Sequence, residues 1–124
     1  MSKTLIVEDS ALYRKLLKET LHSRFPSMEI IEAEDGEEAM RKMSVQFPPD
    51  LIFMDIKLPG ENGLELTGKI KAKHPHVIVI ILTSYDTLEY REAAAQAKAN
   101  HFLSKGSSSK ETILALVESI LAGR

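Results

Sequence analysis

The side chains best suited to phosphate and metal chemistry follow short apolar runs of the sequence, where each run ends. Three carboxylates, two hydroxyls and one ammonium share this position: Glu8, Asp9, Asp55, Thr83, Ser84 and Lys105. Mg²⁺ is usually held by one or two carboxylates together with water and phosphate oxygens. A hydroxyl and an ammonium suit the remaining oxygens of a phosphoryl group. If these side chains converge, they form a site for a divalent cation and a phosphoryl group.

Asp55 is the carboxylate best placed to accept that group. It directly ends the apolar run Leu51–Met54, where desolvation penalises an unpaired charge. Aspartate can act as a phosphoryl nucleophile, and a bound cation neutralises the incoming charge. We therefore predict that Asp55 is the acceptor.

Taken singly, the other residues have ordinary structural interpretations. Asp9, Thr83 and Ser84 are residue types that cap helices, and Lys105 could be a solvated surface lysine. Their joint placement at the ends of four apolar runs favours a common site over four unrelated local roles.

The elements that must position these residues are visible as alternating apolar runs and amphipathic segments. Five runs predict strands: Thr4–Val7, Glu29–Ala33, Leu51–Met54, Val77–Leu82 and His101–Leu103. Several are almost continuously apolar, which is typical of strands buried on both faces of a parallel sheet. The segments between them predict helices, so the expected fold is α/β, a (βα)₅ parallel sheet with helices on both faces and the third strand in the centre.

Two helices are indicated by apolar residues at helical spacing, Leu12, Leu16, Leu17 and Leu21 in the first and Ile113, Leu116, Val117, Ile120 and Leu121 in the last. Four sequences resemble capping boxes at helix starts and begin at Asp35, Asn62, Asp86 and Ser108. In open parallel sheets, ligands bind at the carboxyl ends of the strands near the point where strand order reverses. The predicted topology therefore brings the polar side chains to one edge of the sheet.

Composition narrows the class of protein. The 124 residues suit one domain, 1–124, and a hydrophobic content of 44% supplies one core. A net charge of −2 argues against a general nucleic-acid or membrane-surface binder. The absence of cysteine excludes disulfides, zinc–thiolate sites and cysteine nucleophiles. No apolar run approaches the ~20 residues of a membrane span and no secretory signal precedes the first strand, so a soluble cytoplasmic domain is expected.

Over essentially its whole length the chain resembles the receiver domains of bacterial response regulators. The most specific matching segment runs from Asp50 to Gly63. Three shorter segments match in the same order and at suitable spacing: Leu5–Ser10, Ile81–Ser84 and Phe102–Lys105. The resemblance implies a flavodoxin-like, doubly wound, three-layer fold with strand order 2-1-3-4-5.

The resemblance also implies roles for individual residues. Asp55 would be the phosphoacceptor, and Glu8, Asp9, Asp55 and the backbone carbonyl of Lys57 would hold Mg²⁺ or Mn²⁺. Thr83, Ser84 and Lys105 would bind the phosphoryl oxygens. Phe102 would be an aromatic switch residue that occupies the space left when Thr83 moves inward.

The implied partners are a sensor histidine kinase or phosphotransfer protein as donor, and an output domain or target protein as receiver of the signal. Phosphorylation would change the surface of the fourth helix, fifth strand and fifth helix, through which a homodimer could also form. Direct nucleic-acid binding by this domain and contact with a membrane are not expected.

Two features depart from the family pattern or vary within it. Gly106 follows Lys105 where many members carry proline, so a cis peptide is not expected there. Lys57 and Tyr85 each lie two residues beyond a key position, where family members differ and phosphoryl lifetime is tuned. We hypothesise that Tyr85 shields the acyl phosphate from water.

Three other functions compete with this interpretation. An Mg²⁺-dependent phosphatase with an aspartyl nucleophile generally needs a second acid two residues on, where this chain has Lys57. A flavodoxin-like FMN module needs a Ser/Thr/Gly-rich loop after the first strand, where this chain has Glu8-Asp9-Ser10. A phosphorylation-independent interaction domain of the same fold would not need the acidic residues. No P-loop sequence is present, so nucleotide hydrolysis of that type is excluded.

Overall fold

Strands and helices alternate along residues 2–123, the part of the chain that the computed structural model describes. The strands are β1 (Lys3–Val7), β2 (Glu29–Ala33), β3 (Leu51–Met54), β4 (Ile78–Thr83) and β5 (His101–Ser104). The helices are α1 (Ala11–Arg24), α2 (Gly36–Met43), α3 (Gly63–Lys73), α4 (Leu88–Gln96) and α5 (Lys110–Ala122). The first and last residues of the predicted domain, 1 and 124, lie outside the described residues.

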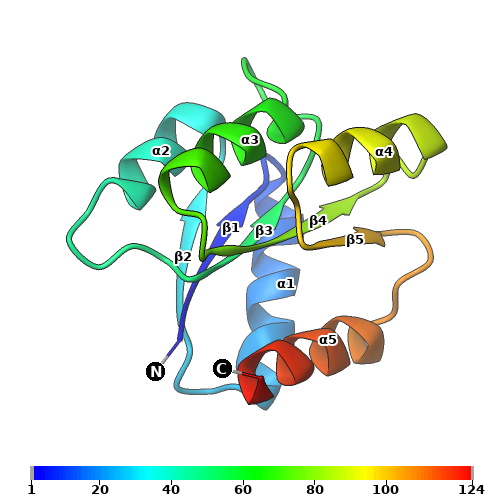
Figure 1. Ribbon diagram of the computed structural model, residues 1–124. Coiled ribbons are helices and arrows are strands. Elements are labelled where there is room, and N and C mark those ends of the chain that lie inside the picture. The colour runs from blue at the N-terminus through cyan, green and yellow to red at the C-terminus, as the bar shows by residue number, and fades with distance from the viewer. Residues whose placement is uncertain (1, 124) are drawn as a thin grey trace.

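The strands form one parallel sheet in the order β2-β1-β3-β4-β5, with β3 at its centre. Helices α2, α3 and α4 cover one face of this sheet, and α1 and α5 cover the other (Figure 1). The predicted α/β architecture and the strand order implied by the resemblance are both confirmed.

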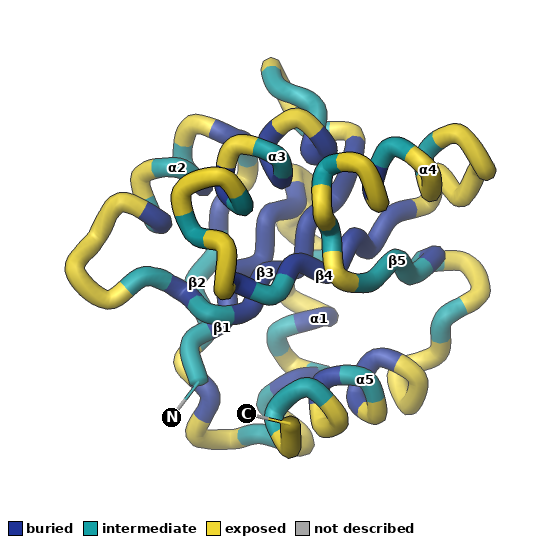
Figure 2. The backbone as a smooth tube through the Cα atoms, viewed as in Figure 1, coloured by how far each residue is buried: buried dark blue, intermediate teal, exposed yellow. Residues whose placement is uncertain are grey.

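The three inner strands β1, β3 and β4 are buried on both faces, as their apolar runs predicted, whereas the edge strands β2 and β5 are mostly half-buried (Figure 2). Along β3, Ile52 and Met54 join the core beneath α2, α3 and α4. Leu51 and Phe53 alternate with them and join the core beneath α1 and α5. This alternation follows from the two-residue period of a strand. Because β3 is packed on both faces, the backbone just before Asp55 is held in place.

Helix starts were predicted correctly where the cap signal is purely local. Asp35 and Asn62 cap α2 and α3, and their side chains accept hydrogen bonds from the N–H groups of Glu38 (2.8 Å) and Leu64 (2.7 Å). The other two predictions were wrong by one residue, since Thr87 caps α4 and Ser109 caps α5.

The two misplaced caps have specific causes. The Asp86 carboxylate is bound by the Arg91 guanidinium at 2.6 and 3.1 Å, which leaves the Thr87 hydroxyl to cap α4. Ser108 closes a turn by donating its N–H to the Ser104 carbonyl at 2.9 Å, so α5 begins after Ser109.

Two further details differ from the prediction. The fourth strand runs one residue later than expected, over Ile78–Thr83, so Thr83 is its fully buried last residue. In α1, Leu17 and Leu21 are buried, but Leu12 and Leu16 are 68% and 45% exposed. The four leucines span too wide an arc of the helix to face one sheet, so the predicted stripe was too broad.

No helix among residues 2–123 has the length and apolar content that crossing a membrane requires.

Candidate functional site

The site lies where β1 and β3 end side by side. Val7 of β1 is in register with Met54 of β3, so the residues after each strand are neighbours. The Asp55 N–H donates to the Val7 carbonyl at 3.0 Å and continues the ladder past the last strand residues. Strand order reverses at this point, because β1 lies between β2 and β3, and such a point is where ligands bind in open parallel sheets.

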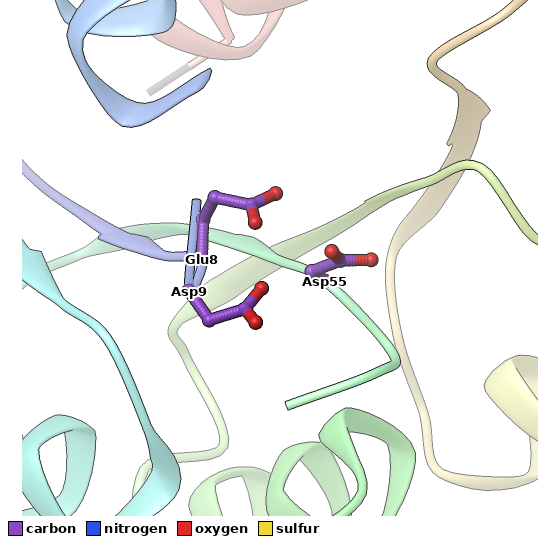
Figure 3. Close-up of side chains that lie close together, drawn as sticks. All are labelled: Glu8, Asp9 and Asp55. Carbon is purple, nitrogen blue, oxygen red and sulfur yellow. The ribbon is translucent and has the colours of Figure 1, made fainter. Parts of the chain in front are cut away.

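Three carboxylates converge there. Glu8, Asp9 and Asp55 each offer an oxygen, and these oxygens all lie within 4.8 Å of one another. Figure 3 shows the side chains of Glu8 and Asp9 at one strand end and that of Asp55 beside them at the other. Glu8 and Asp55 are buried, whereas Asp9 is exposed at the rim. The sequence prediction of an acidic cluster is therefore confirmed in its geometry.

Asp9 does not cap α1, which was the alternative interpretation for that residue. Ser10 caps the helix instead, since its side chain accepts the Tyr13 N–H at 3.1 Å. Asp9 is thus left with its carboxylate in the acidic cluster.

Lys105 supplies positive charge to the cluster. Its ammonium donates to Glu8 Oε1 and, at 3.2 Å, to Asp55 Oδ2. The Lys105 N–H donates to the Thr83 carbonyl at 2.8 Å, which fixes the lysine beside the end of β4. Only 16% of the Lys105 side chain is exposed, so the alternative of a solvated surface lysine was wrong.

The pKa values of Glu8 and Lys105 are both raised, by a balance of burial and the charges of their neighbours. Burial is the main cause that raises the pKa of Glu8, and the negative charge of Asp55 adds to it, despite the opposing bonds from Lys105 and the Ser10 N–H. For Lys105, burial lowers the pKa, but the bond to Glu8 and the negative charge of Asp55 outweigh burial and leave the pKa raised. The site therefore holds a firmly charged ammonium and an excess of negative charge that a cation could offset.

The other carboxylate oxygens of Glu8 and Asp55 are held by backbone N–H groups. Ile56 N–H donates to Asp55 Oδ1 at 2.8 Å, and Ser10 N–H donates to Glu8 Oε2 at 2.9 Å. The Arg14 guanidinium also reaches the Glu8 backbone carbonyl at 2.5 Å and pairs with Glu32 at 3.1 Å. These contacts fix the carboxylates before any ligand arrives, which lowers the cost of binding one.

The two predicted hydroxyl residues differ in their surroundings. Thr83 is fully buried at the end of β4, and its Oγ1 accepts the Tyr85 N–H at 3.2 Å. Ser84 is exposed in the bend that follows. Through this bond Thr83 is linked to the loop before α4. Its backbone carbonyl also accepts the Lys105 N–H, so the two residues are neighbours at the ends of β4 and β5.

Lys57 and Tyr85, the two variable positions, are brought together on the outer side of the site. The Lys57 ammonium lies 5.3 Å from the ring centre of Tyr85 and 5.3 Å from that of Tyr90. The two rings contact edge to face, with centres 6.4 Å apart. Contact with the Tyr90 hydroxyl raises the pKa of Lys57.

Phe102 is half-buried in β5 and packs against the core beneath α4. The Arg91 guanidinium lies 4.6 Å from the centre of its ring while it binds Asp86. Arg91 therefore connects Phe102 in β5 with Asp86 in the loop that precedes α4.

Sequence reasoning missed Tyr13, Tyr90 and Arg91, which contact Lys105, Lys57 and Phe102 respectively. No local sequence signal marks these three residues, because each partner lies on a different element. The peptide bond before Gly106 is trans, as are all the peptide bonds of the described residues.

The residues present fit a hard divalent cation. The donors are three carboxylates from two strand ends, two of them buried, and hard cations of this kind prefer oxygen ligands. Mg²⁺ and Mn²⁺ both accept such a donor set.

Comparison with known proteins identifies relatives over nearly the whole chain. The model of a family described as "Response regulator receiver domain" matches residues 4–118. The chemotaxis protein CheY of Halobacterium salinarum is 36% identical over 103 residues, which are 83% of this chain and 83% of that protein.

Two solved structures share the fold and more than a quarter of their residues with this chain. A CheY-like receiver domain protein from Methanospirillum hungatei has a TM-score of 0.89 and 27% identity, over 99% of this chain and 95% of its own. The Mn²⁺-bound form of response regulator Rcp1 has a TM-score of 0.80 and 27% identity, over 97% of this chain and 91% of its own.

Other curated relatives are longer. The chain spans 26%, 31% and 54% of three of them, and the first two are named as enzymes, a phosphodiesterase and a methylesterase.

Proposed function

This chain belongs to the receiver domains of two-component response regulators, and from that premise we propose that Asp55 accepts a phosphoryl group with Mg²⁺ bound beside it. The observation that carries the proposal is the convergence of Glu8, Asp9 and Asp55 with Lys105 at the reversal point of the sheet. We also propose that residues 1–124 form one receiver domain.

The cation would be held by the carboxylates of Glu8, Asp9 and Asp55 and by the backbone carbonyl of Lys57. When bound, it would offset the charge of the incoming phosphoryl group. The Mn²⁺-bound form of response regulator Rcp1 supports a cation of this class.

Asp55 would act as the nucleophile. One of its carboxylate oxygens forms a bond to phosphorus while the bond from phosphorus to the donor's leaving atom breaks, and the bonding pair leaves with that atom. Backbone contact from the Ile56 N–H keeps the carboxylate oriented during this step. The donor would be a sensor histidine kinase, a phosphotransfer protein or a small phosphodonor.

Thr83, Ser84 and Lys105 would bind the phosphoryl oxygens. Lys105 already contacts Asp55, so its ammonium needs only a small movement to pair with a phosphoryl oxygen there. Thr83 would move inward to donate its hydroxyl, and Phe102 would then occupy the space that Thr83 leaves.

The output would follow from a shift between two populations of the α4-β5-α5 surface. A ligand shifts such an equilibrium only by its difference in affinity for the two states, and the new contacts of Thr83 and Lys105 supply that difference. An output domain or a separate target protein would bind this surface, and a homodimer could form through it. Regulators named as LuxR family among the structural neighbours support an output domain.

The domain would turn over no external substrate, because the position two residues after Asp55 is Lys57 and offers no second acid. It would support only its own phosphorylation and dephosphorylation. Its proposed location is the cytoplasm, and no direct binding to nucleic acid or membranes is proposed.

Amide resonances provide the test. Beryllofluoride and Mg²⁺ together mimic a phosphoryl group on a carboxylate, so they should shift the resonances of Thr83, Phe102 and their neighbours. The same mixture should leave Asp55→Asn unchanged. An intact protein without any response would mean that the fold acts independently of phosphorylation.

A further inference from the structure

Tyr13 lies against the lysine of the site, although neither its type nor its position marks it as functional. It belongs to the first turn of α1, and its half-buried ring centre is 4.1 Å from the Lys105 ammonium. A cation over the face of a tyrosine ring at this distance is attracted by the negative charge of that face. Lys105 therefore has a contact of its own with α1, besides its bonds to Glu8 and Asp55.

The contacts around Tyr13 link four residues in a ring that starts and ends at Glu8. Glu8 accepts the Ser10 N–H at 2.9 Å, and Ser10 accepts the Tyr13 N–H at 3.1 Å. The Tyr13 ring contacts Lys105, and Lys105 donates back to Glu8. The orientation of Tyr13 is thus set by the helix cap that directly follows the acidic pair.

We propose that Tyr13 is a positioning residue, which holds the Lys105 ammonium within reach of Asp55. A lysine has a flexible four-carbon stem and a strongly hydrated ammonium, so carboxylates alone restrain it poorly. The aromatic face restricts the stem and replaces part of its water shell. The inference rests on the proposed function, because holding Lys105 in place matters only if its ammonium binds a phosphoryl group on Asp55.

The position of Tyr13 has a consequence for α1. If Lys105 moves toward a phosphoryl oxygen, the ring that contacts it must follow or lose the contact. Since the Tyr13 N–H is bonded to the cap residue Ser10, that movement reaches the first turn of α1. This turn is therefore coupled to the state of the site.

A first experiment needs no variant and no phosphoryl group. The ε-methylene protons of Lys105 should resonate upfield of those of the exposed Lys15, because the Tyr13 ring current shields them. Identical positions for the two lysines would overturn the proposal.

A second experiment compares two substitutions in the intact chain. Tyr13→Phe keeps the aromatic face, and Tyr13→Leu keeps apolar bulk without it. Beryllofluoride binding with Mg²⁺ should be about fivefold weaker in Tyr13→Leu and nearly unchanged in Tyr13→Phe, as expected for the loss of one cation–π contact. Tyr13→Met replaces the leucine variant if thermal melting shows that the latter is not folded.

The outcomes separate this inference from the proposed function. Equal affinity in wild type and Tyr13→Leu would overturn the positioning role, and so would an equal loss in Tyr13→Phe. A wild type that binds no beryllofluoride would overturn the proposed function instead, while the Lys105 proton shifts would still decide whether Tyr13 positions the lysine.

Discussion

Gly63 is the residue where a single added methyl group should disturb the site most. A Cβ atom at this position would lie 1.8 Å from the Asp55 carbonyl oxygen and 2.9 Å from its carbonyl carbon. Ordinary contact begins near 3.4 Å, so the methyl group overlaps the Asp55 oxygen by 3.4 − 1.8 = 1.6 Å. The obstacle is backbone, which cannot rotate away, and the Gly63 N–H also donates to the Ile56 carbonyl at 2.8 Å.

We therefore predict that Gly63→Ala destabilises the protein. Overpacking of this kind costs up to about 3 kcal/mol. The better helix propensity of alanine returns at most about 1 kcal/mol. The net loss should be about 2 kcal/mol, which lowers the melting temperature by roughly 8 °C for a domain of this size. Because the strain falls on Asp55, Mg²⁺ affinity should fall as well.

Gly68, in the same helix, is the matched control. A Cβ atom there would meet nothing within 4 Å. Gly68→Ala should therefore stabilise the protein by about 0.5–1 kcal/mol through helix propensity alone. Urea unfolding of both variants measures the two effects, and unchanged slopes would confirm that only stability differs. A Gly63→Ala variant as stable as wild type, or equal losses in both variants, would refute the packing argument.

Three further predictions concern the residues around the site. Tyr85→Ala should shorten the lifetime of the phosphorylated state, because it removes the ring that we hypothesise shields the acyl phosphate from water, and the hydrolysis rate measures this directly. Arg91→Ala should broaden or shift the ring resonances of Phe102 and favour the beryllofluoride-bound state, because the guanidinium now holds that ring. Glu8→Gln, measured without metal, should gain stability over wild type as pH rises above 4.5, the usual pKa of glutamate. The raised pKa means that the favourable contribution of protonated Glu8 is lost as pH rises through its folded-state value.

Each of these predictions has its own control. Tyr90→Phe keeps both rings beside Lys57 and leaves Tyr85 in place, so it should preserve the phosphoryl lifetime, and an equal loss there would contradict shielding by Tyr85. Arg91→Lys keeps a cation near Phe102 and should resemble wild type more than Arg91→Ala does. For Glu8→Gln, a stability difference that stays constant between pH 4 and pH 7 would contradict the raised pKa.

The fold could be predicted from the sequence because its signals are local. The central strands β3 and β4 are almost continuous apolar runs, and the caps at Asp35 and Asn62 need only the next three residues. Parallel strands bring their carboxyl ends to one edge, so the acidic cluster followed from the order of the elements.

The contacts between elements could not be predicted in the same way. Asp86 is a better cap by residue type than Thr87, but the Arg91 guanidinium binds its carboxylate. Leu12 has the spacing of a core residue, yet it lies on the part of the helix arc that faces away from the sheet and is exposed. The ring of Tyr13 reaches Lys105 only because α1 begins at the edge of the sheet where β5 ends. These details depend on packing geometry, which residue types and spacing do not encode.

The central claim is that Asp55 accepts the phosphoryl group, and intact-protein mass spectrometry after incubation with a small phosphodonor tests it most directly. The account predicts one added phosphoryl group in the presence of Mg²⁺ and none when the metal is chelated. Asp55→Asn should gain none, whereas Asp50→Asn, at the opposite end of β3, should be labelled as wild type is. Equal labelling of Asp55→Asn, or no labelling of the wild type, would contradict the account.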